Sequence, residues 1–478
     1  MAKLLMHLVL TIFCAMLFLT GCDNSSSPEN KPIDYGSITT IRYSEHVQAL
    51  FNQKCVSCHG PNRAEAGLRL DSWSNVIKGS SAGEAVIPFD SEHSLLVEML
   101  TKLVGGPHPA DQGEEPLSQD AIDFLARWID EGAKNDAGDV PYAGSTHRLY
   151  ACSQNASLVD IIDTQALVVI RTVNLQKLGF RADAKPHHVA IDPDGSHWYL
   201  SMLGESHVLR FDEQNNLVAQ SPEIVLPALL ARLSNQPKLF VSRFLDPNNP
   251  LTDIYVLNTE DLSPAANTEQ GRIPVLFKVP HAIAASHAGD FVYTASLSEN
   301  QLIIINTQTN EVDEFVDLNP HKGPVALAVS PDDRWLYISC QLSNEVLVVD
   351  LQTRQIVAAI PVGQKPWHLA VTPDGSRVYV GNNGSDNASV IDTATRSMVA
   401  TIEHPGFAQP HGIAITNDGK YVFISNRNTT GRYVPRYNLG DNAKVGTVVV
   451  IDTATNQVVK VLEIEPFGSG LGLYEPGA

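Results

Sequence analysis

A recurring β-turn in the last two thirds of the chain restricts the fold more than any other feature. The turn is acidic, and its four clearest copies stand at 192–195, 330–333, 372–375 and 416–419. It belongs to a longer unit of four short strands that opens with a proline. The opening prolines are Pro186, Pro227, Pro280, Pro324, Pro366 and Pro410, separated by 41, 53, 44, 42 and 44 residues. Self-similarity at this period predicts a β-propeller, with one blade per unit.

The two ends of this region predict how the ring closes. The chain before Pro186 has the middle strands of a blade but lacks a first strand, and "SGLGLY" after Pro466 is a first strand without a blade. Joined, they make a seventh blade and leave no sheet edge unpaired. The turns and the closing Ile391-Asp392-Thr393 resemble YVTN-type propellers, so we expect a seven-bladed all-β propeller over residues 147–478. Fold alone does not determine function.

A second motif lies near the start of the chain. Cys55-Val56-Ser57-Cys58-His59 has the C-x-x-C-H spacing of covalent haem attachment. Two thiols three positions apart can form thioethers with the two vinyl groups of one porphyrin, while the adjacent His59 offers an imidazole nitrogen to the iron. No second cysteine pair follows to complete a zinc site. The motif therefore predicts one covalent haem c, held by Cys55, Cys58 and His59.

The flanks of this motif indicate a small helical domain. Apolar residues precede the motif at helical spacing, and a second amphipathic segment lies between Ser118, a typical N-cap, and Gly132. The stretches "VQALFNQKCVSCHGP" and "PLSQDAIDFLARWIDEGA" resemble the planctomycete-type cytochrome c domain. The resemblance covers residues 41–136 and implies an all-α fold around the haem. A linker, residues 137–146, follows.

The loop expected to supply the second iron ligand differs from the pattern of that family. The family supplies methionine from a Met-Pro-Pro loop, whereas the equivalent loop here reads Gly106-Pro107-His108-Pro109. We therefore expect His108 to be the sixth iron ligand; Met99 and an open position are the alternatives. Imidazole in place of a thioether predicts a lower reduction potential.

The first 40 residues predict export. Lys3 precedes an apolar stretch, and Leu19-Thr20-Gly21-Cys22 resembles the lipobox of bacterial lipoproteins. We expect residues 1–21 to be a signal peptide, Cys22 to carry the lipids and residues 22–40 to form a polar tether. This resemblance implies a periplasmic protein anchored in a membrane by lipid, with either membrane possible.

Histidines follow several opening prolines, at His187, His281 and His411. We expect them to lie at one face of the propeller, near its axis. Two interpretations are open: a metal or second cofactor bound by these imidazoles, or rings that hydrogen-bond to neighbouring blades. The longest insertion, residues 428–446, is expected on the same face.

Charge and motifs limit the possible functions. Lys and Arg total 33 against 53 Asp and Glu, a net charge of −20 that excludes nucleic acid as an expected partner. No serine hydrolase or phosphate-loop pattern is present in the sequence. The leading hypothesis is electron transfer to a periplasmic redox partner, with the propeller as docking module. The alternative is an oxidoreductase with a metal or second haem in the propeller, analogous to cytochrome cd1-type proteins, whose propeller has eight blades. Whether the protein is an enzyme stays open.

Overall fold

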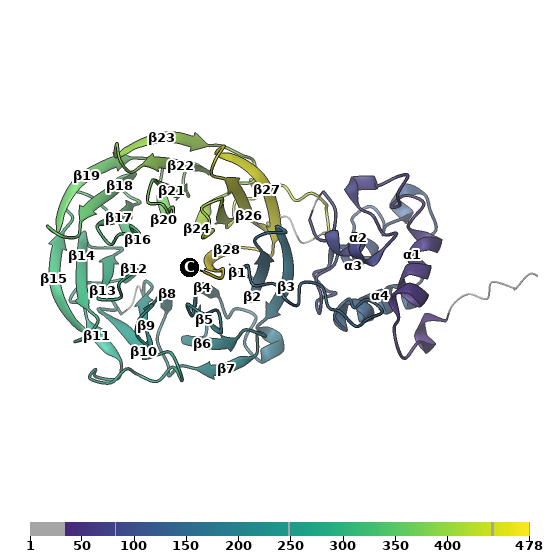
Figure 1. The fold of residues 1–478 in the computed structure, drawn as a ribbon, viewed down its shortest axis with the longest axis horizontal. Helices are drawn as coiled ribbons and strands as arrows, with labels where there is room; N and C mark the ends of the chain where they lie inside the picture. The colour runs from purple at the N-terminus through teal and green to yellow at the C-terminus, as the bar shows by residue number, and fades with distance from the viewer. Residues whose placement is uncertain (1–33, 82, 247–248, 441–443, 478) are drawn as a thin grey trace, which may run out of the picture.

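The computed structural model describes residues 34–477, apart from 82, 247–248 and 441–443. It contains a small helical domain beside a large ring of strands (Figure 1). Cys22 and the expected signal peptide lie outside the described residues. Within the described ranges, no helix combines the length and the apolar content needed to cross a membrane.

The ring is a seven-bladed β-propeller of four-stranded antiparallel sheets, each written here from the innermost strand outward. Blade 1 contains β28 (Gly468–Tyr474), β1 (Arg148–Ser153), β2 (Leu158–Asp163) and β3 (Val168–Asn174). Blades 2 and 3 contain β4 (Pro186–Ile191), β5 (His197–Met202), β6 (His207–Asp212) and β7 (Leu217–Gln220), then β8 (Pro227–Arg232), β9 (Lys238–Arg243), β10 (Asp253–Asn258) and β11 (Arg272–Pro274). Blades 4 and 5 contain β12 (Pro280–Ala285), β13 (Phe291–Ser296), β14 (Gln301–Asn306) and β15 (Glu311–Asp317), then β16 (Pro324–Val329), β17 (Trp335–Cys340), β18 (Glu345–Asp350) and β19 (Gln355–Pro361). Blades 6 and 7 contain β20 (Pro366–Val371), β21 (Arg377–Asn382), β22 (Asn387–Asp392) and β23 (Ser397–Ile402), then β24 (Pro410–Ile415), β25 (Tyr421–Asn426), β26 (Gly446–Asp452) and β27 (Gln457–Ile464).

The predicted closure of the ring is confirmed. Strand β28, from the C-terminal segment, pairs antiparallel with β1, so that Arg148 lies opposite Tyr474. All six opening prolines begin the innermost strand of their blade. Cys152 and Cys340 are buried free thiols.

The recurring turn is held by its aspartate. In the copy at 372–375, Asp374 Oδ1 accepts hydrogen bonds from the Thr372 hydroxyl at 2.6 Å and from the Ser376 N–H at 3.0 Å. Gly375 then adopts a φ of 72°, which glycine reaches without steric cost. The turn thereby joins an innermost strand to the next strand of the same blade.

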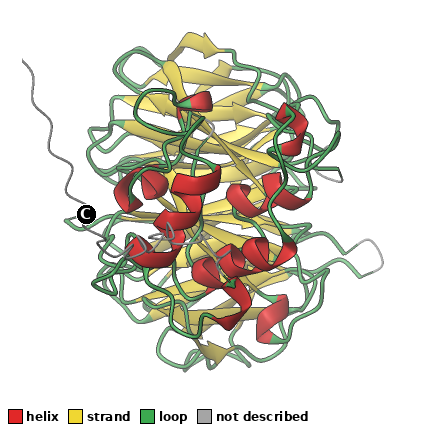
Figure 2. Cartoon of the chain, turned by 90° about the vertical axis from the view of Figure 1, so that its right-hand side faces the viewer, coloured by secondary structure: helices red, strands yellow, loops and turns green. Residues whose placement is uncertain are grey.

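The helical domain consists of short helices around one apolar core. The α-helices are α1 (Gln48–Lys54), α2 (Trp73–Lys78), α3 (Leu95–Thr101) and α4 (Gln119–Asp130), with a π-helix at Tyr43–Val47 and 3-10 turns at Tyr35–Ser37, Glu65–Gly67 and Ala110–Gln112; a further 3-10 turn, Gln176–Leu178, lies in the propeller. Ser118 caps α4 as predicted, its Oγ accepting from the Ala121 N–H at 3.4 Å. Trp128 of α4 packs edge-on against Phe51 of α1, with ring centres 6.4 Å apart. Figure 2 shows this domain against the rim of the propeller.

Direct contacts join the two domains. Ile87 is buried in a cluster that includes Leu149 and Val448 of the propeller. The Glu84 carboxylate accepts from the Val169 N–H of β3 at 3.2 Å. The insertion between β25 and β26 also takes part, because the Asn438 carbonyl accepts from the Val104 N–H at 2.9 Å. The insertion therefore links the propeller to the loop that carries His108.

Candidate functional site

The Cys-x-x-Cys-His motif continues the turn that ends α1. The Cys58 N–H donates to the Cys55 carbonyl at 3.1 Å, and the His59 N–H donates to the same carbonyl at 2.9 Å. Both thiols are free and half-buried. Burial, with a smaller contribution from Cys58, raises the pKa of Cys55 to about 12. The two thiols and the imidazole thus sit on one tight turn.

His59 faces His108, which is carried by the loop between α3 and α4. Their ring centres are 5.9 Å apart and the ring planes are inclined by 59°. The Nδ1 atom of His59 is buried without a hydrogen-bond partner. Burial lowers the pKa of His59, and the charge of His108 lowers it further. Neutral imidazole is the form that binds a metal ion.

A carboxylate orients His108. Its Nδ1 lies 2.8 Å from Asp111 Oδ1, which leaves Nε2 available to a metal ion. Met99, the alternative to His108, lies on α3, and its backbone carbonyl accepts from the His108 N–H at 2.9 Å. The structure therefore brings the imidazole of His108 beside His59.

These residues fit a covalently bound haem. Two imidazoles that share one metal ion, each through a bond of about 2 Å, have ring centres about 6 Å apart. The observed separation of 5.9 Å between His59 and His108 agrees with this value. The free thiols of Cys55 and Cys58 stand on the same turn as His59.

A second concentration of histidines lies where the innermost strands begin. It contains His187 and His188 of β4, His281 of β12, His368 of β20 and His411 of β24, which we call the axial histidine cluster. Ring centres are 6.1 Å apart for His187 and His281, and 5.7 Å for His187 and His411. His368 lies 5.1 Å from His411 and 6.3 Å from His188. The three histidines singled out in the sequence therefore belong to one group of five.

Hydrogen bonds define the chemistry of individual rings in this cluster. His281 Nδ1 lies 3.0 Å from the Val325 carbonyl of the next blade, so this nitrogen donates. His188 Nδ1 accepts from the Leu230 N–H at 3.3 Å. Several ring nitrogens are buried without a partner: Nε2 of His187, His281, His368 and His411, and Nδ1 of His411.

Arg427 adds a positive charge to this cluster. It follows β25, and its guanidinium lies 4.8 Å from the ring centre of Trp367 and 4.7 Å from that of Phe467. Among the described residues, no carboxylate forms an ion pair with it. Burial lowers the pKa of Arg427 to about 10. No sequence pattern marks this arginine, because its aromatic neighbours come from other parts of the ring.

The pKa values of the cluster are lowered throughout. Burial, followed by the charge of His281, lowers the pKa of His188 to about 4. For His281 burial also dominates and gives about 4, with Arg427 acting in the same direction. Burial lowers the pKa of His187, His368 and His411 further, and the charge of Arg427 contributes in each case. All five imidazoles are therefore neutral at pH 7.

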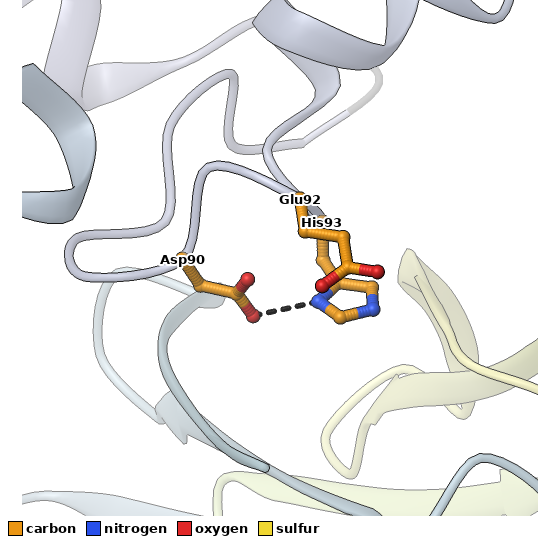
Figure 3. A group of neighbouring side chains, drawn as sticks. All are labelled: Asp90, Glu92 and His93. Atoms are coloured by element: carbon orange, nitrogen blue, oxygen red, sulfur yellow. Dashed lines mark hydrogen bonds and ion pairs between the residues drawn. The ribbon is translucent and has the colours of Figure 1, made fainter. Parts of the chain in front are cut away.

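The propeller histidines do not form a ready three-ligand metal site. In the part of the chain that the structure describes, one group places three donor atoms within 4.8 Å of one another: Asp90, Glu92 and His93 (Figure 3). There, Asp90 Oδ2 lies 2.7 Å from His93 Nδ1. Burial acts to lower the pKa of His93, but the hydrogen bond and charge of Asp90 outweigh it and raise the pKa to about 9. This group is an ion pair near the boundary with the propeller.

Comparisons with known proteins agree with both halves of the fold. Residues 55–106 match the family described as Planctomycete cytochrome C, and residues 307–404 match the family described as Lactonase, 7-bladed beta-propeller. The two resemblances seen in the sequence, to that cytochrome domain and to a seven-bladed propeller, are confirmed. No curated protein matches the chain.

Solved structures similar to this chain have low sequence identity to it. The dihydro-heme d1 dehydrogenase NirN, in complex with DHE, is 17% identical, with 89% of this chain and 98% of that chain covered and a TM-score of 0.50. A functionally unknown protein from Desulfotomaculum acetoxidans is 15% identical; the match covers 69% of this chain and 99% of that chain, with a TM-score of 0.51. Hydrazine synthase from Kuenenia stuttgartiensis is 18% identical; the match covers 60% of this chain and 88% of that chain, with a TM-score of 0.48.

Proposed function

We propose that this chain, which joins a planctomycete-type cytochrome c domain to a seven-bladed propeller, is an electron-transfer protein with one covalent haem c. The observation that carries the proposal is the pair of facing imidazoles, His59 and His108, beside two free thiols on one turn. The propeller serves as the module that docks a redox partner.

Each residue of the haem site has a distinct role in this proposal. Cys55 and Cys58 would hold the group covalently, and the imidazoles of His59 and His108 would bind its iron. Asp111 accepts the Nδ1–H of His108 and so fixes which nitrogen faces the iron. The bound haem supplies one-electron transfer. Two imidazole ligands set a lower reduction potential than one imidazole and one thioether would.

The proposal includes a location. The lipobox-like Leu19-Thr20-Gly21-Cys22 supports export and lipidation at Cys22, followed by anchoring to a membrane in the periplasm. C-type haem and a lipid anchor are compatible, because both are attached to exported chains. The redox partner is then a periplasmic protein.

Substitution at the sixth position tests the haem site. His108→Ala, in the haem-loaded full chain, should convert a six-coordinate low-spin absorption spectrum to a high-spin one and raise the reduction potential. Met99→Leu is the matched control and should change neither. An unchanged low-spin spectrum in His108→Ala would overturn the assignment of His108. Retention of two thioether bonds in Cys55→Ser, measured by mass spectrometry, would overturn the motif itself.

A second candidate is an oxidoreductase with its own cofactor in the propeller. Two observations favour it: the unpartnered nitrogens of the axial histidine cluster, and a fold shared over both domains with a dehydrogenase whose structure contains DHE. Elemental analysis of the purified exported protein separates the candidates. One iron per haem and no other metal supports electron transfer with a docking module. A second iron, or stoichiometric copper or zinc that His187→Ala or His411→Ala removes, supports the enzyme.

A further inference from the structure

Arg427 has a charge that no carboxylate among the described residues balances. Its guanidinium lies over the rings of Trp367 and Phe467, and its Nε is buried without a hydrogen-bond partner among the described residues. No described carboxylate pairs with it, and the neighbouring imidazoles are neutral. A partly buried cation in a neutral surrounding is stabilised by an anion. The position of Arg427 therefore favours a negatively charged ligand over a metal cation, which the guanidinium would repel.

The axial histidine cluster supplies hydrogen-bond donors beside this charge. His188 Nδ1 accepts from the Leu230 N–H, so its proton resides on Nε2. Neither nitrogen of His411 has a partner, and a neutral imidazole always carries one proton. Two N–H groups are thus available to the oxygens of an anion.

Two rings of the cluster, His281 and His187, supply an acceptor instead. In His187, Nδ1 lies 3.1 Å from Gln154 Oε1 and so donates, which leaves a lone pair on Nε2. His281 Nδ1 donates to the Val325 carbonyl, so the buried Nε2 of this neutral ring bears a lone pair. A lone pair next to an anion's oxygen is repulsive unless that oxygen carries a hydrogen. The cluster therefore matches an oxyanion that has a hydroxyl group among its oxygens.

We propose that the axial histidine cluster and Arg427 bind a small hydroxyl-bearing oxyanion, such as hydrogen phosphate or bicarbonate. Arg427 pairs with the charge, His188 and His411 donate to the unprotonated oxygens, and the hydroxyl donates to His281 Nε2. Trp367, His188 and Arg427 are half-buried, whereas His281 and His411 are fully buried. The anion would therefore enter past the three half-buried side chains. This site is independent of the haem proposal.

Isosteric anion pairs test the proposal. Calorimetric titration of the haem-loaded full chain at pH 7 compares phosphate with sulfate, and bicarbonate with nitrate. Within each pair the shape is the same, but only the first member carries a hydroxyl. We expect the hydroxyl-bearing member of at least one pair to bind ten times more tightly or better, because its partner leaves a buried acceptor unsatisfied. The pair that binds defines the size of the ligand.

Three variants locate the binding. Arg427→Gln should abolish it, whereas Arg396→Gln, which removes an arginine stacked on Trp335 at 4.6 Å elsewhere in the ring, should leave affinity unchanged. His281→Asn keeps a donor for the Val325 carbonyl but removes Nε2, and it should bring the two members of a pair within threefold of each other. All variants are compared at equal haem content.

Four results would overturn the proposal. They are the absence of binding by all four anions, equal affinity within both pairs, unchanged affinity in Arg427→Gln, and stoichiometric copper or zinc that His281→Asn releases but Arg427→Gln retains. The last result would assign the cluster to a metal ion.

Discussion

Replacing Glu84 by glutamine should stabilise the protein at alkaline pH and leave it almost unchanged at acidic pH. Glu84 lies at the boundary between the two domains, where its carboxylate accepts from the Val169 N–H of β3. It lines a cavity of about 100 Å³ together with Asp160. Burial raises the pKa of Glu84 to about 7, and burial likewise raises the pKa of Asp160 to about 7.

The magnitude follows from the pKa of Glu84. An increase from 4.5 to about 7 corresponds to about 3 kcal/mol against the ionised form, at about 1.4 kcal/mol per pH unit. Because the pKa is raised in the folded state, the neutral carboxyl is fully accommodated below pH 4.5, and stability is lost as the pH rises towards 7. Glutamine never ionises and avoids this loss. The side chain retains some solvent exposure, so we expect a gain of about 1 to 3 kcal/mol at pH 8.

Thermal unfolding of the full chain at pH 5 and pH 8 measures this difference. Glu84→Gln should raise the midpoint at pH 8 by several degrees and change it little at pH 5. The control Glu131→Gln removes an exposed glutamate whose ion pair with Arg127, at 4.0 Å, contributes little. An equal gain at both pH values, or no gain at pH 8, would refute the view that ionisation of Glu84 weakens domain docking.

Two further substitutions test the packing. Ser118→Ala removes the N-cap of α4 and should lower the free energy of unfolding of the helical domain by about 1 kcal/mol, measured by urea titration at the haem absorbance. Gly470→Ala in β28 should be far more damaging, by about 3 kcal/mol or more, because its Cβ would lie 2.2 Å from the His187 carbonyl oxygen. The control Gly144→Ala places a Cβ with nothing within 4 Å, and calorimetry should show no comparable loss. Equal unfolding midpoints for Gly470→Ala and Gly144→Ala would contradict the expected clash where β28 closes the ring.

The sequence predicted those features that depend on local or repeated chemistry. The opening prolines begin their strands because proline has no N–H to donate and is tolerated at the first residue of a strand. The spacing of Cys55, Cys58 and His59 is short enough to read directly. The closure of the ring by β28 could be predicted because the first blade lacks one strand and the C-terminal segment supplies one. These features need no knowledge of distant contacts.

The remaining features depend on how the ring and the helical domain pack in space. Arg427 is one arginine among many until Trp367 and Phe467 are placed in contact with it. The contact of Asn438 with Val104 needs both domains at once. Glu84 likewise has an altered pKa only because the propeller covers it, and no sequence pattern marks that burial.

The pairing of β28 with β1 sets an order of events during synthesis. Blade 1 cannot be completed until residues 468–474 have left the ribosome, because its innermost strand is the last strand made. The core of the helical domain is assembled from residues 35–133, which precede all the strands of the ring. Folding of this domain thus does not wait for the ring. Cys55 and Cys58 therefore belong to a domain whose own core can form before the ring is closed.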